Sequence, residues 1–308
     1  MISARTKNNT LIEFPRFFNG YEVISFENNG HSSVVFKVKE SSSNAKRAAI
    51  VIPKMDLINE NQLNNKNNEI TIHMALNHPN IVRVYDAFEI TNYKKEEFIV
   101  IVEEYCSKGS LSSYIEKNGL KDKFTRTKIE NGLLQAILYL HGTGFVHRAI
   151  NSQNVLIDKN LNVKLSNFSC CEFCQDENST QFKDDLWSIG SIFYILSEGK
   201  PLANPIYDDD GCLHVRIEDR RSKELIEKCT YRDADKRPSI EELLYIFTTH
   251  DDDEEKEVQN QELFKEDKKD SSCSFLNNCY TDLSIDYGCK NDIKQSKYCK
   301  KNTKKPRR

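Results

Sequence analysis

The spacing of hydrophobic residues changes along the chain, and this change constrains the fold most strongly. Residues 21–54 contain three segments in which apolar and polar residues alternate, separated by polar turns, as antiparallel strands require. Residues 127–141 instead carry apolar side chains at helical spacing. These are Ile129, Leu133, Ala136, Ile137 and Leu140. The pattern predicts a β-rich first part and, later in the chain, a helix with one buried face.

The composition is that of a globular protein with one large or two ordinary domains. The chain has 308 residues, of which 38% are hydrophobic, and its formal net charge is −3. We find no apolar run of the roughly eighteen residues that a membrane span needs, and residues 1–20 lack the apolar core of a secretion signal. We therefore expect no membrane contact and a cytoplasmic location. The ten cysteines show no paired regularity, which favours reduced thiols.

The last part of the chain has a different composition. Residues 251–255 are all acidic, and the segment from Lys300 to Arg308 is strongly basic. Blocks of like charge with few large apolar residues are typical of disorder, so residues 249–308 are predicted to be a disordered tail. The basic end could contact nucleic acid or direct the protein to the nucleus, and a merely solvated terminus is an equal alternative. Cys171 and Cys174 have the spacing of a zinc knuckle but stand alone, so no metal site is expected there.

One central stretch carries a resemblance to a known family. Residues 144–157 read Gly-Phe-Val-His-Arg-Ala-Ile-Asn-Ser-Gln-Asn-Val-Leu-Ile. This stretch resembles the catalytic loop of eukaryotic protein kinases, H-R-D-L-K-x-x-N, in which the Asp accepts the substrate hydroxyl proton and the Asn holds a metal. His147, Arg148 and Asn154 match this pattern. The Asp position, however, is Ala149, which has no group that can accept a proton.

Segments on both sides of this loop resemble the same family. The matching segments are residues 78–88, 98–106, 160–169, 185–196 and 234–239. The resemblance implies a two-lobed α+β fold over residues 21–248, with a small antiparallel β-lobe plus one helix and a larger, mainly helical lobe. Residues 1–20 would be an N-terminal extension.

The resemblance also implies that three chemical groups needed for phosphoryl transfer are missing. Val51 stands at the position of the phosphate-pairing Lys, and Lys54, the nearest lysine, falls on the opposite face of an extended strand. The metal-binding triplet Asp-Phe-Gly begins here with Asn167, and an amide is a weaker magnesium ligand than a carboxylate. Together with Ala149, these positions imply no catalytic residue and no metal site, although Asn154 is retained. They predict that the chain is not an enzyme.

A degenerate nucleotide cleft is a further implication of the resemblance. Its lining would consist of Gly30, Val35, Ala49, Glu104 and Cys106. If Glu104 is the hinge acid, then Glu103 is the gatekeeper at the back of this cleft; a shift by one residue is an equal alternative. No cofactor is expected, and weak ATP binding without turnover is the alternative.

The residues that join the two lobes are better preserved in this resemblance. His73, Val84, His147 and Phe168 are expected to stack through the core. Asp185 should anchor the catalytic loop. Arg237 lacks the Glu with which it pairs in the family, and Glu172 or Glu177 could replace that partner.

These observations predict a catalytically inactive kinase-like domain, a pseudokinase that serves signalling as a protein-binding scaffold or allosteric regulator. Its partner would be another protein, for example an active kinase. This role is an inference by elimination, since a fold does not by itself determine a function. The first alternative is a weakly active or atypical serine/threonine kinase that uses displaced groups such as Lys54. The second is a nucleic-acid-associated factor that acts through residues 300–308.

Overall fold

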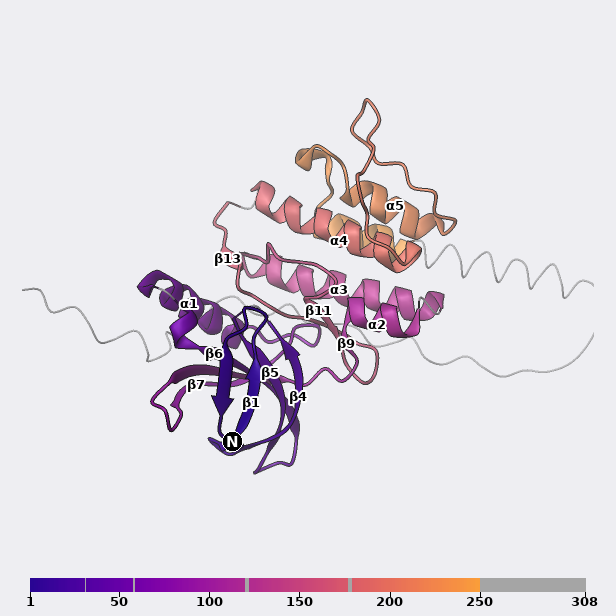
Figure 1. Cartoon of the computed structure of the whole chain (residues 1–308). Helices are drawn as coiled ribbons and strands as arrows, with labels where there is room; N and C mark the ends of the chain where they lie inside the picture. The colour runs from indigo at the N-terminus through magenta and orange to yellow at the C-terminus, as the bar shows by residue number, and fades with distance from the viewer. Residues whose placement is uncertain (31, 58, 120–121, 177–178, 250–308) are drawn as a thin grey trace, which may run out of the picture. The chain divides into compact units, whose positions relative to one another are not determined.

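The computed structural model describes residues 1–249 of the chain, except residues 31, 58, 120, 121, 177 and 178 (Figure 1). The predicted tail therefore lies, from residue 250 onward, outside the described residues, and so does the basic segment from Lys300 to Arg308. Within the described part, no helix combines the length and the apolar character that crossing a bilayer demands.

The first part of the chain forms a six-stranded antiparallel sheet with one long helix. The strand order is β3-β4-β5-β6-β8-β7, and a separate hairpin of β1 and β2 precedes the sheet (Figure 1). The strands are β1 (Ile2–Arg5), β2 (Leu11–Phe14), β3 (Phe17–Phe18), β4 (Tyr21–Asn29), β5 (Val34–Glu40), β6 (Lys46–Pro53), β7 (Val84–Thr91) and β8 (Glu97–Glu104). A short 3-10 helix η1 (Lys54–Asp56) and the helix α1 (Glu60–Ala75) lie between β6 and β7 in the sequence.

The two faces of this sheet bury different partners. On one face, Ile12 and Phe14 of β2 join a core that includes Phe36 and Phe98, and the Phe14 ring lies 6.0 and 5.8 Å from the rings of these two residues. The N-terminal residues, set apart above as an extension, thus complete the core of the β-lobe. The opposite face packs against α1 through a smaller apolar cluster. That cluster contains Ile50, Ile52, Leu63, Ile70, Ile99 and Ile101.

The second part of the described chain is mainly helical. Its helices are α2 (Leu111–Asn118), α3 (Lys123–Gly142), α4 (Thr180–Glu198), α5 (Arg220–Cys229), the 3-10 helix η2 (Ala234–Lys236) and a last helix over residues 240–249. Its short strands are β9 (Gly109–Ser110), β10 (Phe145–Val146), β11 (Val155–Ile157), β12 (Val163–Leu165) and β13 (Glu172–Phe173). The predicted two-lobed α+β fold is confirmed.

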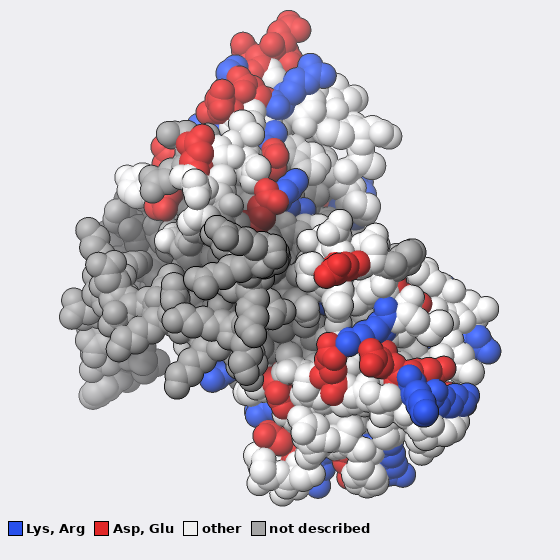
Figure 2. Space-filling model, turned by 90° about the vertical axis from the view of Figure 1, so that its left-hand side faces the viewer, with Lys and Arg blue, Asp and Glu red and all other residues white. Residues whose placement is uncertain are grey.

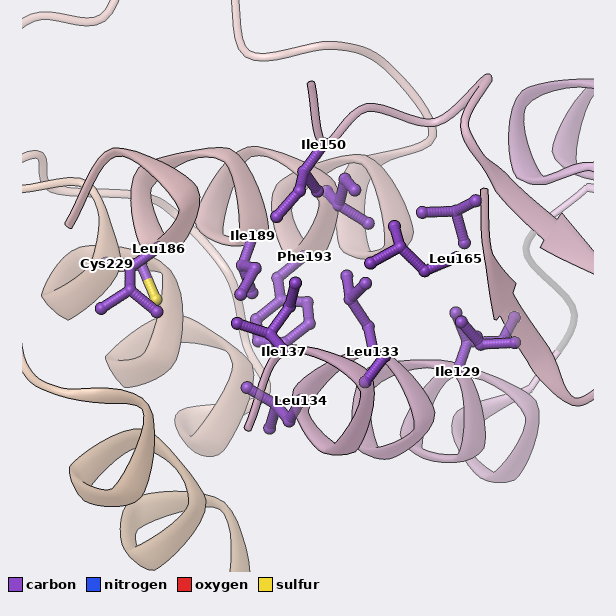
Figure 3. Close-up of a cluster of buried hydrophobic side chains, with 14 of the residues drawn as sticks. Ile129, Leu133, Leu134, Ile137, Ile150, Leu165, Leu186, Ile189, Phe193 and Cys229 are labelled. Carbon is purple, nitrogen blue, oxygen red and sulfur yellow. The ribbon is translucent and has the colours of Figure 1, made fainter. Parts of the chain in front are cut away.

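The core of this helical part lies between α3, α4 and the loops beside them (Figure 3). The buried face predicted for residues 127–141 is confirmed, since all five apolar residues named above are at most 1% exposed. Figure 3 shows Leu133 and Ile137 of α3 close to Phe193 and Ile189 of α4, with Cys229 of α5 beside Leu186. Burial of such side chains contributes about 1.5–3 kcal/mol each, which makes this cluster the main source of stability in the helical part.

Local signals in the sequence explain where these helices begin and end. The side chains of Asp122, Ser179 and Asp219 accept hydrogen bonds from backbone N–H groups in the first turns of α3, α4 and α5. Gly199 ends α4 with a φ of 73°, a left-handed conformation in which glycine has no steric cost. The position of α4 matters for the site below, because this helix carries Asp185.

Gly190 of α4 is expected to be indispensable to the packing of α4 on α5. A Cβ atom at this position would lie 2.6 Å from the Cβ of Cys229 and 2.8 Å from the Cγ2 of Thr230. Gly190→Ala should therefore lower the free energy of unfolding by ~1–3 kcal/mol, measured by urea denaturation. Gly142→Ala is the matched control, because a Cβ there meets nothing within 4 Å. Equal stability of the two variants would show that α4 and α5 move apart to accept the methyl group without loss of free energy of unfolding.

Candidate active site

The loop between β10 and β11 is held by a buried carboxyl group on α4. Asp185 is fully buried, and its oxygens accept hydrogen bonds from the backbone N–H groups of His147 and Arg148, both at 2.8 Å. The Nε2 atom of His141 lies 3.0 Å from the same carboxyl group. Arg148 has a φ of 61°, which is unfavourable for a residue with a side chain. Asp185 thus stabilises a strained loop conformation, as expected from the sequence.

Ala149 presents its backbone, and not a side-chain acid, at the position of the proton acceptor. Its carbonyl oxygen accepts a hydrogen bond from the Nδ2 of Asn154 at 2.7 Å. The Oδ1 of Asn154 in turn accepts a hydrogen bond from the Nδ2 of Asn167 at 3.1 Å. The structure therefore brings together all three of these predicted site residues.

This arrangement does not fit a magnesium ion. The two side chains at the expected metal positions, Asn154 and Asn167, are neutral amides that hydrogen-bond to each other. Magnesium in phosphate-transferring sites is bound through one or two carboxylates together with phosphates and water. Neither position supplies a carboxylate, so we assign no step to a metal in this loop.

The orientation of β6 differs from the sequence-based expectation. Ala49 and Val51 belong to the core that contains Phe14, on the face of the sheet away from α1. Ile50 packs against α1, and its strand partner is Val35. The placement of Ala49 and Val51 toward the cleft is therefore wrong by one residue. The position of the phosphate-pairing lysine is taken by Ile50, which is aliphatic as well.

Lys54 forms ion pairs with two acids of the sheet. Its Nζ atom lies 2.6 Å from Glu89 and 3.3 Å from Glu97, on the strands β7 and β8. Glu69 of α1 instead pairs with Lys66, one turn earlier on the same helix, and both side chains are largely buried. Lys66 is not among the residues expected at the site from the sequence, although a spacing of three residues places two helical side chains side by side.

Glu103 lies in the interior, beneath α1. It is 7% exposed, and burial raises its pKa to about 8; Glu69 nearby acts in the same direction and Lys66 opposes it. The Oε1 of Glu103 lies 3.5 Å from the Nδ1 of His73, whose Nε2 lies 2.7 Å from the carbonyl oxygen of Val82. Burial lowers the pKa of His73 to about 4. A protonated Glu103 next to a neutral His73 is therefore the state favoured near neutral pH.

Glu104 has a different environment from its neighbour. Its side chain is partly exposed and pairs with Lys164 at 2.8 Å. Its backbone N–H donates to the carbonyl oxygen of Arg83 at 2.8 Å. Of the two neighbouring acids, the structure thus places Glu103 at the buried position and Glu104 at the edge.

Of the remaining residues expected at the cleft, Gly30 is engaged in backbone hydrogen bonds and Cys106 is buried. The N–H of Gly30 donates to the carbonyl oxygen of Ser33, and its carbonyl oxygen accepts from the N–H of Lys7, both at 2.8 Å. Gly30 therefore belongs to a hydrogen-bonded turn tied to the N-terminal hairpin. Cys106 is 9% exposed, and burial raises its pKa to about 12, so its thiol is unreactive at neutral pH.

Three of the four residues expected to stack do so: His73, Phe168 and His147. The ring of Phe168 lies 4.4 Å from that of His73 and 4.9 Å from that of His147. Val84 packs against the apolar cluster under α1. This stack connects α1 to the loop that Asp185 holds.

The expected partner of Arg237 is corrected by the structure. Its Nη1 atom lies 3.1 Å from the Oδ1 of Asp184, the residue just before Asp185. Glu172 pairs with Arg148 instead, and Glu177 lies outside the described residues. Asp184 is available because α4 begins at Thr180, with only ten residues between it and Ser169.

Comparisons with known proteins agree with this architecture. A sequence model of the protein kinase domain matches residues 28–184, about half of the chain. The serine/threonine-protein kinase PLK4 of Drosophila virilis is 26% identical over 279 residues, which cover 79% of this chain and 34% of that protein. The NUAK family SNF1-like kinase 1 of Mus musculus is 35% identical over 144 residues, which cover 46% of this chain and 20% of that protein. The chain thus spans about a third or less of the length of these relatives.

The prediction that the chain is not an enzyme is contradicted by these comparisons, because the matching family is the protein kinase domain and both relatives are named as kinases. The family match spans the strained loop, the Asn167 triplet and the Lys66–Glu69 pair. From the match over half its length and the fold that accompanies it, we conclude that this chain belongs to the protein kinase domain family.

Proposed function

We propose that the chain is an atypical serine/threonine protein kinase of low turnover, in which Lys66 replaces the missing strand lysine. The observation that carries this proposal is the ion pair between Lys66 and Glu69 on α1. In the family, Glu of this helix pairs with a lysine that contacts the ATP phosphates. Lys66 restores that pair from the helix, and its charge acts on Glu103, so its ammonium group lies near the buried gatekeeper.

The chemistry of this proposal is a direct transfer from ATP. The hydroxyl oxygen of a serine or threonine substrate attacks the γ-phosphorus, the bond to ADP breaks, and the hydroxyl proton leaves to water or to the phosphate, since Ala149 cannot accept it. Phosphoryl transfer depends mainly on positioning and charge stabilisation, so a positioned cation supports it without a base. General-base catalysis contributes about 10²–10⁴-fold, so the expected rate is lower than that of a complete kinase by this factor or more.

We further propose that the substrate or partner is a protein. The relatives are named as serine/threonine-protein kinase and SNF1-like kinase, and the matching domain is one that acts on proteins. An active kinase is one candidate for such a partner. The residues proposed above for nucleic-acid contact lie outside the described part of the chain and add nothing to this proposal.

The test is Lys66→Met, with Lys54→Met as the matched control. Transfer of labelled phosphate from ATP to a library of serine and threonine peptides should fall by about tenfold or more in Lys66→Met, because the phosphate loses its cationic partner. Lys54→Met should leave transfer unchanged, since Lys54 pairs with Glu89 and Glu97. Lys66→Arg, which keeps the charge, should retain part of the activity.

The assay is run with magnesium and with a chelator, together with a thermal-shift measurement with ATP. Absence of transfer at high protein concentration in both conditions would refute the proposed activity. Transfer that is insensitive to Lys66→Met would leave an atypical kinase but would remove Lys66 from its mechanism.

A further inference from the structure

A cluster of three potential metal ligands lies far from the loop of Ala149 in the sequence, in the segment between α4 and α5. The side chains are those of Asp208, Cys212 and His214. One ligand atom from each residue lies within 4.8 Å of the others. In the part of the chain that the structure describes, no other group of His, Cys, Asp or Glu meets this condition.

The three residues are placed by a tight turn that needs no metal to form. The backbone N–H groups of Gly211 and Asp208 donate to the carbonyl oxygens of Asp208 and Cys212, both at 3.0 Å. The Oδ1 of Asp208 accepts the N–H of Cys212 at 2.8 Å, which leaves its Oδ2 atom 2.7 Å from the Nε2 of His214. The ligand atoms are thus brought together by the local fold.

Residues that follow α5 in the sequence hold this turn in place. The N–H of Arg232 donates to the carbonyl oxygen of Gly211 at 2.9 Å, and the Nζ of Lys236 donates to that of Asp210 at 2.9 Å. The thiol of Cys212 is hydrogen-bonded to the side chain of Tyr231. The Sγ atom of Cys212, at 9% exposure for the residue, is therefore held at the inner side of the turn.

His214 has the second partner that metal-binding histidines usually have. Its Nδ1 atom lies 3.6 Å from the Oε1 of Glu227 on α5, and the same Oε1 atom accepts the N–H of Val215 at 3.2 Å. A carboxylate near one ring nitrogen helps to orient the imidazole, so that the other nitrogen can face a metal. Here that other nitrogen is Nε2, which is hydrogen-bonded to the Oδ2 of Asp208 at 2.7 Å and would exchange this bond for the metal.

We propose that Asp208, Cys212 and His214 bind a zinc ion, with water at the fourth position and Glu227 as the partner of the imidazole. A sulfur, an imidazole nitrogen and a carboxylate oxygen form a donor set that zinc accepts in tetrahedral geometry, and the soft sulfur disfavours magnesium and calcium. Binding releases the thiol proton of Cys212 to solvent and forms the zinc–sulfur bond. The ion would join the segment between the helices to α5.

The surroundings also favour a cation. Asp209 and Asp210 follow Asp208 directly in the sequence. Figure 2 shows acidic side chains at the upper end of the view, the end where the segment between α4 and α5 lies in Figure 1, with basic side chains beside them. Lys236 is bound to the backbone of Asp210 in this turn, so Asp208 and Asp209 contribute the negative charge. This site is independent of the kinase activity proposed above, because it shares no residue with it.

The test is a titration of the metal-free full chain with cobalt(II) and with zinc. One equivalent of cobalt should produce a near-ultraviolet charge-transfer absorption from the cobalt–thiolate bond, which zinc should abolish. Cys212→Ser should remove the absorption, and His214→Ala should weaken zinc binding by about tenfold or more. Glu227→Gln should weaken it by about 10-fold, as for other such partners of metal-bound histidine.

Cys174→Ser is the matched control. Cys174 forms with Cys171 the cysteine pair that has the spacing of a zinc knuckle, and its replacement should leave the titration unchanged. The side chain of His214 is 67% exposed, so we expect His214→Ala to leave the core intact, and circular dichroism of the variant checks this. A thermal shift of a few degrees with zinc should accompany binding in the wild type and not in His214→Ala. Absence of thiolate absorption in the wild type, or its loss in Cys174→Ser but not in Cys212→Ser, would overturn the proposal.

Discussion

Asp185→Ala is expected to lower the free energy of unfolding by about 3–5 kcal/mol, the largest effect of any single change considered for this protein. The change removes the acceptor of the buried backbone N–H of His147 and of the part-buried N–H of Arg148, together with the partner of His141. Each buried donor left without a partner costs about 1–3 kcal/mol. Urea denaturation followed by circular dichroism measures the loss.

Asp184→Ala is the control for this prediction. The Asp184 side chain is 67% exposed, and the Arg237 that it contacts also donates to the backbone oxygens of Lys183 and Tyr231. Arg237 is buried but keeps these backbone acceptors, so loss of the exposed carboxylate should cost only about 0–1 kcal/mol, the value of a solvent-exposed ion pair. If both variants lost the same stability, the loop would not depend on the buried carboxyl group.

Glu103→Gln is expected to change how stability depends on pH. Burial raises the pKa of Glu103 from 4.5 to about 8, so the folded protein holds a proton that the unfolded chain releases above about pH 4.5. A group that binds more protons in the folded state makes the free energy of unfolding fall as the pH rises. The fall in the free energy of unfolding that is due to Glu103 should therefore extend from about pH 4.5 to about pH 8 and then level off.

The contribution of Glu103 is best separated from that of His73 between pH 6.5 and pH 8. Burial lowers the pKa of His73 to about 4, so His73 lowers stability only as the pH falls below its ordinary pKa of 6.5. Above that value Glu103 acts alone in this cluster, and the wild type should lose about 1.5–2 kcal/mol more than Glu103→Gln across the window. Urea denaturation at several pH values checks this. Parallel curves for the two proteins would show that Glu103 is ionised in the folded state.

Glu104→Gln provides the matched comparison for this experiment. Glu104 is the neighbouring acid, but it is partly exposed and pairs with Lys164. Measured over the same pH window, this variant separates the effect of the buried acid from that of losing a neighbouring carboxyl group. The contrast between the two adjacent acids would place the titrating group beneath α1.

Local patterns in the sequence sufficed for much of the fold and for part of the site. The helical spacing around Leu133 predicts the buried face of α3 because the period of a helix repeats within a few residues. Ala149 and Asn167 could be singled out from the sequence because each lies in a motif whose neighbours match on both sides, and in the structure both contact Asn154. What a missing group means for activity does not follow from the motif alone, and there the comparisons corrected the prediction.

The sequence by itself determined that the position of the strand lysine on β6 is aliphatic, because both Ile50 and Val51 are. Whether Ile50 or Val51 occupies that position was decided only by the tertiary structure. A strand alternates with a period of two, so Val51 and Ile50 are equally good candidates until the partners of each face are known. The N-terminal Phe14 covers one face and α1 covers the other, which turns Val51 away and Ile50 inward. The pairing of Glu69 with Lys66 and of Arg237 with Asp184 depends in the same way on which atoms the folded chain brings within reach.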